Sequence, residues 1–255
     1  MLPGGAEVIY GRRPVAEALR AGVRPQRLVL ARGSKPSPIL SEIEDLARRS
    51  GVAVSYEARG TLSHLVPSGN HQGVVAVVEP FEYRPSETLL RAGEVSRLVL
   101  LDGVTDPANL GSILRSAEAF GWQGVLIPRR RAVGVTAAVR RIAAGAAERV
   151  PVAWVGSPAG TVTRLHGDGF RVIGLDPEAA TPHDALECRD RRICLVAGAE
   201  GRGLSQLVRR RCHELIRIPM RGKLASLNVA VALAVVMAEV ARQGDSSSEK
   251  KPAGT

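Results

Sequence analysis

The chain has 255 residues and a mass of 27.0 kDa, and its 45% hydrophobic and 24% charged residues are typical of a globular protein of one or two domains. The 35 Lys and Arg residues outnumber the 25 Asp and Glu residues, which favours a polyanionic partner such as a nucleic acid over a membrane surface. The longest stretch without a charged residue or a histidine, residues 224–238, is shorter than the roughly 20 residues that cross a bilayer. We therefore expect no membrane-spanning helix.

The N-terminus lacks the charged start, apolar run and cleavage site of a signal peptide, which predicts a cytoplasmic protein. Cys188, Cys194 and Cys212 contain no Cys-x-x-Cys pair and are odd in number, so they favour buried, unreactive thiols over disulfides or a zinc site. The histidines show no metal-ligand spacing, and we expect no metal.

The first 80 residues alternate helical and strand patterns, which indicates a small α/β unit. The predicted helices are residues 14–19 and 39–49, and the predicted strands are residues 27–31, 52–56 and 73–79. Pro14 suits the first turn of the first helix. The next segment combines two prolines with mixed charge, so we expect a domain of residues 1–78 and a linker of residues 79–96.

From residue 97 onward, short apolar runs bounded by Gly, Asp and Pro alternate with helical patterns, which predicts a βα repeat with buried parallel strands. The apolar runs are RLVLLDG, GVLIP, VPVAWV, FRVIGLD, RICLVAG and ELIRIP. The predicted helices are residues 109–120, 135–147, 157–166, 203–212 and 226–242. A second domain over residues 97–243 and a disordered tail over residues 244–255 follow from this pattern.

Three segments carry candidate chemistry, and the first is residues 101–121. A strand leads into a turn-rich loop and a helix that begins near Asn109, where asparagine is a good N-cap. Ser112, Arg115 and Ala119 share one face of this helix, and Arg115 projects beside the loop. A solvated Arg115 and a purely capping Asn109 are the simpler alternative.

The second segment, LVAGAEGRGLS at residues 195–205, runs from a strand into a glycine-rich turn and a helix. Glycines let the backbone approach a ligand closely. Their order matches neither the dinucleotide fingerprint Gly-x-Gly-x-x-Gly nor a P-loop. Glu200 lies in this turn, where saturation by local backbone amides is its alternative interpretation.

The third segment, residues 218–237, combines a strand end, a polar loop and a helix that is apolar on nearly all sides and is therefore expected to be buried. Ser226 and Asn228 fall in its predicted first turn, so polar groups and free backbone amides face the strand ends. Capping alone is the alternative explanation of Ser226.

Taken together and in this order, the three segments resemble the motifs of the SpoU/TrmH family of RNA ribose 2'-O-methyltransferases. IYGRRPVAEALRAG near the start and HQGVVAVVEP at residues 71–80 look like the N-terminal domain of the bacterial 23S rRNA guanosine 2'-O-methyltransferases. The resemblance implies an α/β protein with a small L30e-like RNA-binding domain and a SPOUT catalytic domain, which has a parallel sheet and a C-terminal trefoil knot. Periodicity alone gives no sign of a knot.

The resemblance also implies that S-adenosylmethionine binds in the knot, mostly through backbone groups. The residues that match the cofactor positions are Gly198, Ile218 and Leu227, with Ala199, Glu200, Met220, Ser226 and Asn228 close by. Small and apolar side chains can surround an adenine, and unpaired amides can bind ribose hydroxyls and a carboxylate. The catalytic positions implied are Asn109 and Arg115, with Glu200 and Ser226 in support.

The implied reaction is in-line displacement at the cofactor's methyl group by a ribose 2'-oxygen. An arginine side chain stays protonated in proteins, so we interpret Arg115 as a ligand of the adjoining phosphate that stabilises the forming alkoxide, and not as a base. The sequence departs from the family's usual Ser-Leu-Asn-Val-Ser at Ala230, which therefore has no polar role.

Aromatic residues make up only 3% of the chain, which argues against RNA binding by base stacking and favours phosphate contacts. The candidate cations are Arg12 and Arg13, Arg129 to Arg131, Arg140 and Arg141, Arg209 to Arg211, and the loop residues Arg221 and Lys223. A solvated face is the simpler explanation of any one of the arginine clusters, but the overall excess of positive charge argues against it for all of them together. For the loop of Arg221 and Lys223, a solvated loop and RNA contact are equal alternatives.

The expected partners are RNA, with 23S rRNA first, and a second copy of the chain in a homodimer with the knot at the interface; DNA and membranes are not expected. A tRNA ribose 2'-O-methyltransferase of the same fold is one alternative, which the N-terminal extension disfavours. A non-enzymatic RNA-binding protein is another, and the intact Asn109, Arg115, Glu200 and Ser226 argue against it.

Overall fold

The computed structural model describes residues 7–66, 70–91, 93, 96–188 and 192–248, with side chains described as far as residue 243. The chain forms two compact units. The first comprises Met1–Glu82 together with Gly134–Arg149, and the second comprises Tyr83–Val133 together with Val150–Thr255. Residues 134–149, which the sequence pattern placed within the catalytic domain, thus pack with the N-terminal unit.

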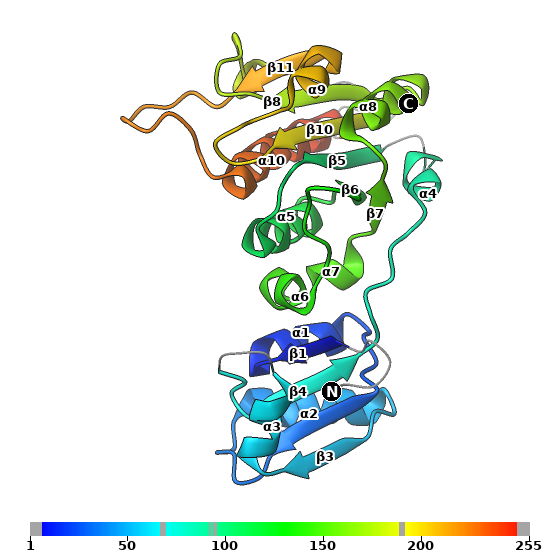
Figure 1. Ribbon diagram of the computed structural model, residues 1–255, viewed down its shortest axis with the longest axis vertical. Coiled ribbons are helices and arrows are strands. Elements are labelled where there is room, and N and C mark those ends of the chain that lie inside the picture. Colours follow the sequence, from blue (N-terminus) through cyan, green and yellow to red (C-terminus); the bar gives the residue numbers. More distant parts are fainter. Residues whose placement is uncertain (1–6, 67–69, 92, 94–95, 189–191, 249–255) are drawn as a thin grey trace, which may run out of the picture. The chain divides into compact units, whose positions relative to one another are not determined.

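The first unit is a four-stranded sheet with helices on both faces (Figure 1). Its elements are β1 (Glu7–Tyr10), α1 (Arg12–Arg20), β2 (Arg27–Ala31), α2 (Pro38–Arg49), β3 (Val54–Glu57), α3 (Arg59–Leu65) and β4 (Val74–Val78). The strand order is β1-β4-β2-β3, with β4 antiparallel to both neighbours and β3 parallel to β2. Alternate residues of each strand face α1 and α2 on one side and Leu62 of α3 on the other.

Within this unit the predicted helices and strands are present, with ends shifted by one or two residues. The sequence patterns missed β1 and α3. β1 has only four residues, and α3 contains Gly60 and Ser63, which are poor helix formers, so neither segment shows a strong period.

The single helix predicted over residues 135–147 is wrong, because two short helices lie there: α6 (Ala137–Ala143) and α7 (Ala146–Arg149). The break falls at Ala144 and Gly145, whose φ angles are +50° and +87°. A Cβ on Gly145 would lie 2.9 Å from the carbonyl oxygen of Glu17 in α1, so the close approach of this turn to α1 requires glycine.

The His71–Gly73 turn of the first unit depends on a neutral imidazole. His71 is 5% exposed; its Nδ1 accepts a hydrogen bond from the Gly73 amide at 3.0 Å, and its Nε2 lies 3.3 Å from the Ser63 hydroxyl. Burial, and secondarily the charge of Arg59, lowers the pKa of His71 below the ordinary 6.5. The folded protein therefore binds this proton less readily than the unfolded chain does.

We expect the stability that depends on neutral His71 to be complete above about pH 6.5 and to decline as the pH falls below that value. Urea unfolding at pH 8 and pH 5.5 measures this decline. His71→Gln should show a smaller decline than the parent protein, and His64→Gln, which changes an exposed histidine, should match the parent. Equal pH dependence in all three proteins would contradict the assignment.

The second unit is built on a seven-stranded sheet in the order β7-β6-β5-β10-β8-β11-β9. Every pairing in it is parallel, which confirms the prediction of a parallel sheet. The strands are β5 (Ser96–Asp102), β6 (Gly124–Pro128), β7 (Val152–Val155), β8 (Arg171–Leu175), β9 (Thr181–Pro182), β10 (Arg192–Gly198) and β11 (Glu214–Arg217). The two-residue β9 was not predicted, because it is too short to show a pattern.

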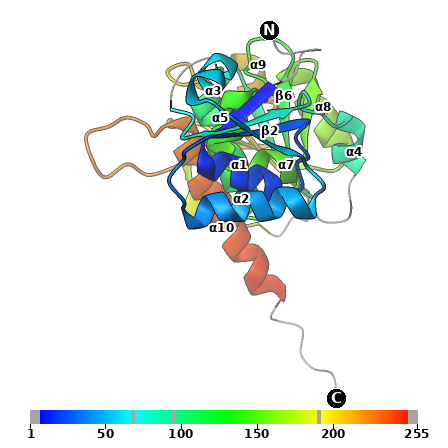
Figure 2. The same cartoon turned by 90° about the horizontal axis from the view of Figure 1, so that it is seen from below.

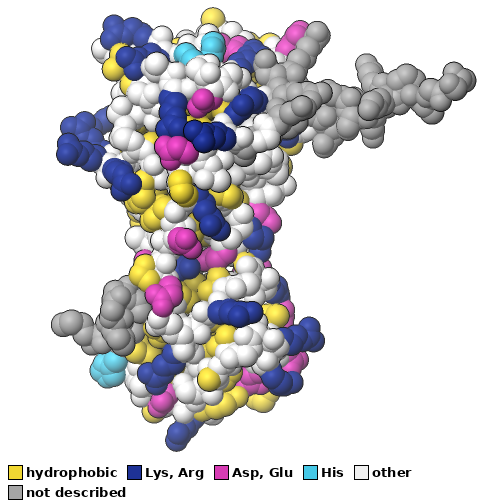
Figure 3. Space-filling view, turned by 90° about the vertical axis from the view of Figure 1, so that its right-hand side faces the viewer, with side chains coloured by type: hydrophobic (Ala, Val, Ile, Leu, Met, Phe, Trp, Pro, Cys, Tyr) yellow, Lys and Arg dark blue, Asp and Glu magenta, His cyan; other side chains and the backbone are white. Residues whose placement is uncertain are grey.

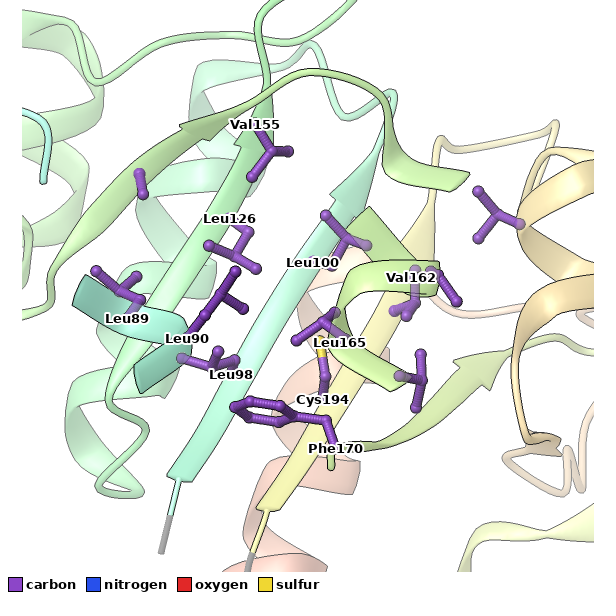
Figure 4. Packing of buried hydrophobic residues seen from close by; sticks show 14 of the residues in the cluster. Leu89, Leu90, Leu98, Leu100, Leu126, Val155, Val162, Leu165, Phe170 and Cys194 are labelled. Carbon is purple, nitrogen blue, oxygen red and sulfur yellow. The ribbon is translucent and has the colours of Figure 1, made fainter. Parts of the chain in front are cut away.

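Helices cover both faces of this sheet. They are α4 (Ser86–Arg91), α5 (Pro107–Ala119), α8 (Pro158–Gly167), α9 (Gln206–Arg211) and α10 (Val229–Ser248), with a 3-10 turn at His183–Ala185. α4, α8 and α9 pack on one face, where Phe170, Leu165 and Leu98 belong to one buried cluster (Figure 4). α5 and α10 pack against each other and the other face.

The segment predicted as a linker contains α4, whose Leu89 and Leu90 are buried in this cluster. Pro80 and Pro85 both precede the helix, so they do not interrupt it. The trefoil knot implied by the family resemblance stays a prediction.

α10 begins later and ends later than predicted. It starts at Val229, because the Asn228 side chain caps it by accepting hydrogen bonds from the Ala230 and Val231 amides at 2.9 and 3.3 Å. It extends through residues 244–248, part of the predicted disordered tail, and residues 249–255 lie outside the described part (Figure 2). Within residues 7–248, apart from the undescribed gaps, no helix is long and apolar enough to span a membrane.

Candidate active site

The three motif segments follow the carboxyl ends of β5, β10 and β11, and these ends lie on one edge because the sheet is parallel. β5 and β10 are adjacent, and β8 separates β10 from β11. Neighbouring strands are about 4.8 Å apart, so the first and second motifs are direct neighbours and the third is about 10 Å from the second. The end of β8 lies between them.

A cavity lies at this edge, and its volume is about 840 Å³ when the open solvent at its mouth is included. The predicted residues among its lining are Gly198, Ala199, Glu200, Ile218, Met220, Ser226 and Leu227. Sequence reasoning missed the contributions of β8 and α10, which include Leu175, Asp176, Pro177, Val229, Ala232 and Val236. The second and third motifs thus form one mostly apolar pocket.

In the turn after β10, the backbone of residues 198–199 lies close to that of residues 203–204. The Gly203 amide donates a 2.8 Å hydrogen bond to the Ala199 carbonyl, and Gly201 and Gly203 have φ angles of +74° and +65°. A Cβ on Gly198 would lie 2.0 Å from the carbonyl carbon and oxygen of Gly203 and 2.4 Å from the Leu204 nitrogen. No side chain fits there, so this turn requires glycine at position 198.

Side-chain amides from the first and third motifs meet the Glu200 carboxylate of the second. Asn109 donates from Nδ2 to Glu200 Oε1 at 3.2 Å, and its Oδ1 accepts from Asn228 Nδ2 at 2.8 Å. Asn228 Nδ2 also donates to Glu200 Oε1. Glu200 is therefore engaged by side chains, and the interpretation that local backbone amides saturate it is wrong.

The prediction that Asn109 caps its helix is also wrong. α5 begins at Pro107, and Asp106 caps it by accepting the Ala108 amide at 2.9 Å. Asn109 therefore lies in the first turn, where it is only 6% exposed and points to Glu200 and Asn228. The first motif is also tied to the second through Asp102, whose Oδ2 accepts the Ser205 amide at 2.8 Å.

The fold does not bring Arg115 to the cavity. It is exposed, shares the exposed face of α5 with Ala108, Ser112 and Ala119, and is not part of the cavity lining. Within the described part of the chain, its guanidinium has no hydrogen-bond or ion-pair partner. Its catalytic role stays a prediction.

Asp176, at the end of β8, is a polar lining residue that the sequence analysis did not single out. Its Oδ2 forms an ion pair with Arg209 Nε at 2.6 Å, and its Oδ1 accepts a hydrogen bond from the Glu178 amide at 2.9 Å. An Asp that closes an apolar run looks like an ordinary strand boundary, so only the fold places it at the cavity.

The thiols and acidic groups give no sign of redox or metal chemistry among the described residues. Burial raises the pKa of Cys188 to about 11 and that of Cys212 to about 12, and it also raises the pKa of Cys194. The prediction of buried thiols holds for Cys194, whereas Cys188 and Cys212 are only partly buried. Their lack of reactivity stays a prediction. No group of three His, Cys, Asp or Glu residues in the described ranges could hold a metal ion.

Two family models match the chain. The model of the SpoU rRNA methylase family covers residues 96–238, more than half of the sequence. The chain belongs to this family. A second model, that of the RNA 2'-O ribose methyltransferase substrate-binding domain, covers residues 8–84 and so matches the N-terminal unit.

Relatives of this SpoU family member extend over nearly its whole length. An uncharacterized tRNA/rRNA methyltransferase of Mycobacterium avium is 43% identical over 240 residues, 93% of this chain and 77% of the relative. The SpoU methyltransferase AviRb from Streptomyces viridochromogenes, which was also solved with the cofactor AdoMet, is 27% identical with a TM-score of 0.78, covering 95% of this chain and 91% of AviRb. An AdoMet-bound rRNA methyltransferase from Sinorhizobium meliloti is 25% identical with a TM-score of 0.75, covering 93% and 87%. The chain is thus an RNA methyltransferase of the SpoU family.

Proposed function

We propose that this protein transfers a methyl group from S-adenosylmethionine to the ribose 2'-hydroxyl of a guanosine in 23S rRNA. The observation that carries the proposal is the meeting of three motifs at one sheet edge, where Asn109, Glu200 and Asn228 are hydrogen bonded beside a cavity lined by Gly198 and Leu227. The AdoMet complex of AviRb supports the choice of cofactor. A cytoplasmic location stays part of this proposal.

The residues of the cavity fit such a cofactor. Ile218, Leu227 and Val236 give it apolar walls that suit an adenine, and the glycine-rich turn after β10 brings backbone groups to its rim without intervening side chains. When bound, S-adenosylmethionine would supply a methyl group on a positively charged sulfur. Transfer of this methyl to the ribose oxygen would break the S–C bond, leave a neutral thioether and release the hydroxyl proton.

The chain's own residues then position the RNA and stabilise the negative charge that develops on the ribose oxygen. The buried Asn109 fixes the Glu200 carboxylate relative to the third motif, which keeps the mouth of the cavity in one geometry. Arg115 keeps its positive charge, so its role in the proposal is to bind the phosphate beside the target ribose and stabilise the developing alkoxide. Ser226, at the cavity wall, is a supporting residue.

We further propose a homodimer in which α10 lies at the interface. This helix is apolar on nearly all sides, yet Val231 is 49% exposed and Val235 and Ala238 next to it are only partly buried. An apolar helix face of this kind is typical of a surface that a second subunit covers. A second subunit on this face would bury the helix, as its apolar sequence leads us to expect.

Val231→Arg is expected to convert the dimer to monomer, because it places a charge in an apolar interface. The measurement is the molar mass in solution by light scattering. Leu207→Arg is the matched control: Leu207 is 46% exposed, but it lies on α9. A parent protein that is already monomeric, or a Val231→Arg protein that stays dimeric, would contradict the proposed interface.

The test of the proposed activity is transfer of labelled methyl from S-adenosylmethionine to purified 23S rRNA and, separately, to tRNA. We expect label in 23S rRNA, and nuclease digestion followed by mass spectrometry should find it in 2'-O-methylguanosine. Label only in tRNA would favour the tRNA enzyme of the same fold. Tight RNA binding without any transfer would favour a non-enzymatic binding protein.

A further inference from the structure

The structure separates the arginine clusters that the sequence left equivalent. On the face shown in Figure 3, Lys and Arg side chains stand out over both units, and several lie next to acidic side chains. A cation that already has a partner within the protein is less available to a phosphate. The contacts of each cluster therefore indicate which one is free to bind RNA.

Two clusters of the first unit are largely engaged in structure. Arg140 is 7% exposed, pairs with Glu148 at 2.8 Å and donates to the Glu79 carbonyl at 3.0 Å. Arg141 donates to the Tyr10 hydroxyl at 3.0 Å. Arg12 donates to the Gln72 carbonyl at 3.1 Å and the Ser37 hydroxyl at 3.0 Å, whereas Arg13 has no partner in the described part of the chain.

The α9 cluster is also mostly engaged. Arg209 pairs with Asp176 at 2.6 Å. Arg211 donates to the Ala159 carbonyl at 2.8 Å and the Thr163 hydroxyl at 3.0 Å. Only Arg210 of this cluster is exposed without a partner among the described residues.

The loop Arg129–Arg131 differs from these three clusters, because all three of its side chains are exposed and none has a hydrogen-bond or ion-pair partner in the described ranges. Arg221 and Lys223 are also exposed and unpaired in those ranges, but they are two cations against three. Its backbone is nevertheless held. The Arg129 amide donates to the Val155 carbonyl at 3.0 Å, and the Val133 amide donates to the Val104 carbonyl at 3.1 Å. The three charges are thus carried by an anchored loop, so binding a polyanion costs little ordering of its backbone.

This loop follows β6 and lies on the same edge of the sheet as the cavity. The Arg131 carbonyl oxygen is 3.9 Å from the position that a Cβ on Gly103 would take, and the Cβ of Ala199 is 3.6 Å from that position. The loop therefore borders the first motif, and Ala199 of the cavity lies on the other side of Gly103.

From this placement we infer that Arg129–Arg131 binds the phosphate backbone of the substrate RNA next to the target nucleotide. The inference rests on the proposed function and assigns an RNA-contacting surface to the catalytic unit itself, in addition to the N-terminal unit. Three unpaired guanidiniums on one anchored loop suit consecutive phosphates, which arginine binds with paired donors.

The test is a variant with Arg129, Arg130 and Arg131 all replaced by Gln. RNA affinity is measured by fluorescence anisotropy with a 23S rRNA fragment over a series of salt concentrations. Each lost phosphate contact on a single strand lowers the slope of log affinity against log salt by about 0.7, so we expect a slope shallower by about 2. We also expect KM for RNA to rise about tenfold at moderate salt, with little change in kcat at saturating RNA and none in cofactor affinity.

The matched control replaces Arg49, Arg84 and Arg91 by Gln, because these three side chains are exposed, lack partners among the described residues, belong to none of the candidate clusters and give the same change in net charge. Its salt slope should stay close to that of the parent. Equal slopes in the two triple variants would overturn the inference. Failure of this inference and failure of the proposed function can be distinguished. A parent protein that transfers no methyl group would refute the proposed activity, whereas the salt slopes of RNA binding would still test the loop.

Discussion

Gly198→Ala is expected to weaken cofactor binding strongly. The added methyl would lie 2.0 Å from the carbonyl group of Gly203 and 2.4 Å from the Leu204 nitrogen, and these are backbone atoms that cannot rotate away. The turn must open, which displaces Ala199 and Glu200 from the cavity wall. We expect at least about a 100-fold weaker Kd for S-adenosylmethionine by calorimetry and a stability loss of about 3 kcal/mol.

The control for this substitution is Gly156→Ala. Gly156 follows β7 on the same edge of the sheet, but no atom lies within 4 Å of the position its Cβ would take, and its φ is not in the left-handed region. This variant should bind the cofactor as the parent does. Normal binding by Gly198→Ala would show that the pocket at this turn is not the cofactor site.

Much of the fold follows from local pattern. The runs RLVLLDG and RICLVAG are apolar on both faces because helices cover both sides of the sheet, which is why they were predictable as buried parallel strands. The helix break at Gly145 was not predictable, because it depends on contact with the Glu17 carbonyl more than 100 residues away. The same holds for the packing of residues 134–149 with the N-terminal unit.

The candidate site was also predictable only in part. The family resemblance implied that Gly198, Ile218 and Leu227 contact the cofactor, and the structure places all three in the lining of one cavity. Asn109 was expected at a catalytic position, but its hydrogen bonds to Glu200 and Asn228 were not, because Asn is a frequent helix cap and only the fold reveals that Asp106 takes that position. Asp176 was missed because its strand carries no motif.

The structure also explains why charge patterns alone could not locate the RNA surface. Arg140 and Arg129 are both members of arginine runs, yet one is buried against Glu148 and the other is exposed and unpaired within the described part of the chain. Sequence gives the number of positive charges, whereas their availability depends on partners that are distant along the chain.

Arg115→Lys is expected to lower turnover by about 100-fold or more while RNA affinity and stability stay close to those of the parent. Lys keeps the charge but lacks the planar pair of donors that fits a phosphate and the developing alkoxide. Because Arg115 is exposed and unpartnered within the described ranges, its replacement should shift Tm by less than about 2 °C. Single-turnover methylation measures the loss of turnover, and thermal unfolding measures the change in stability. The control is Arg91→Lys, because Arg91 lies on the opposite edge of the sheet. Near-normal methylation would contradict the role.

The position of Arg115 leads to a second expected result. Since it does not line the cavity of its own subunit, the proposed dimer must bring it to the partner's cavity. A mixture of two inactive proteins, Arg115→Ala and Glu200→Gln, then contains hybrid dimers in which one cavity has an intact Glu200 and receives an intact Arg115. Random exchange should restore about one quarter of the parent activity. If the mixture stays inactive although hybrid dimers form, Arg115 acts within its own subunit, and closure of α5 over the cavity on RNA binding would be needed instead.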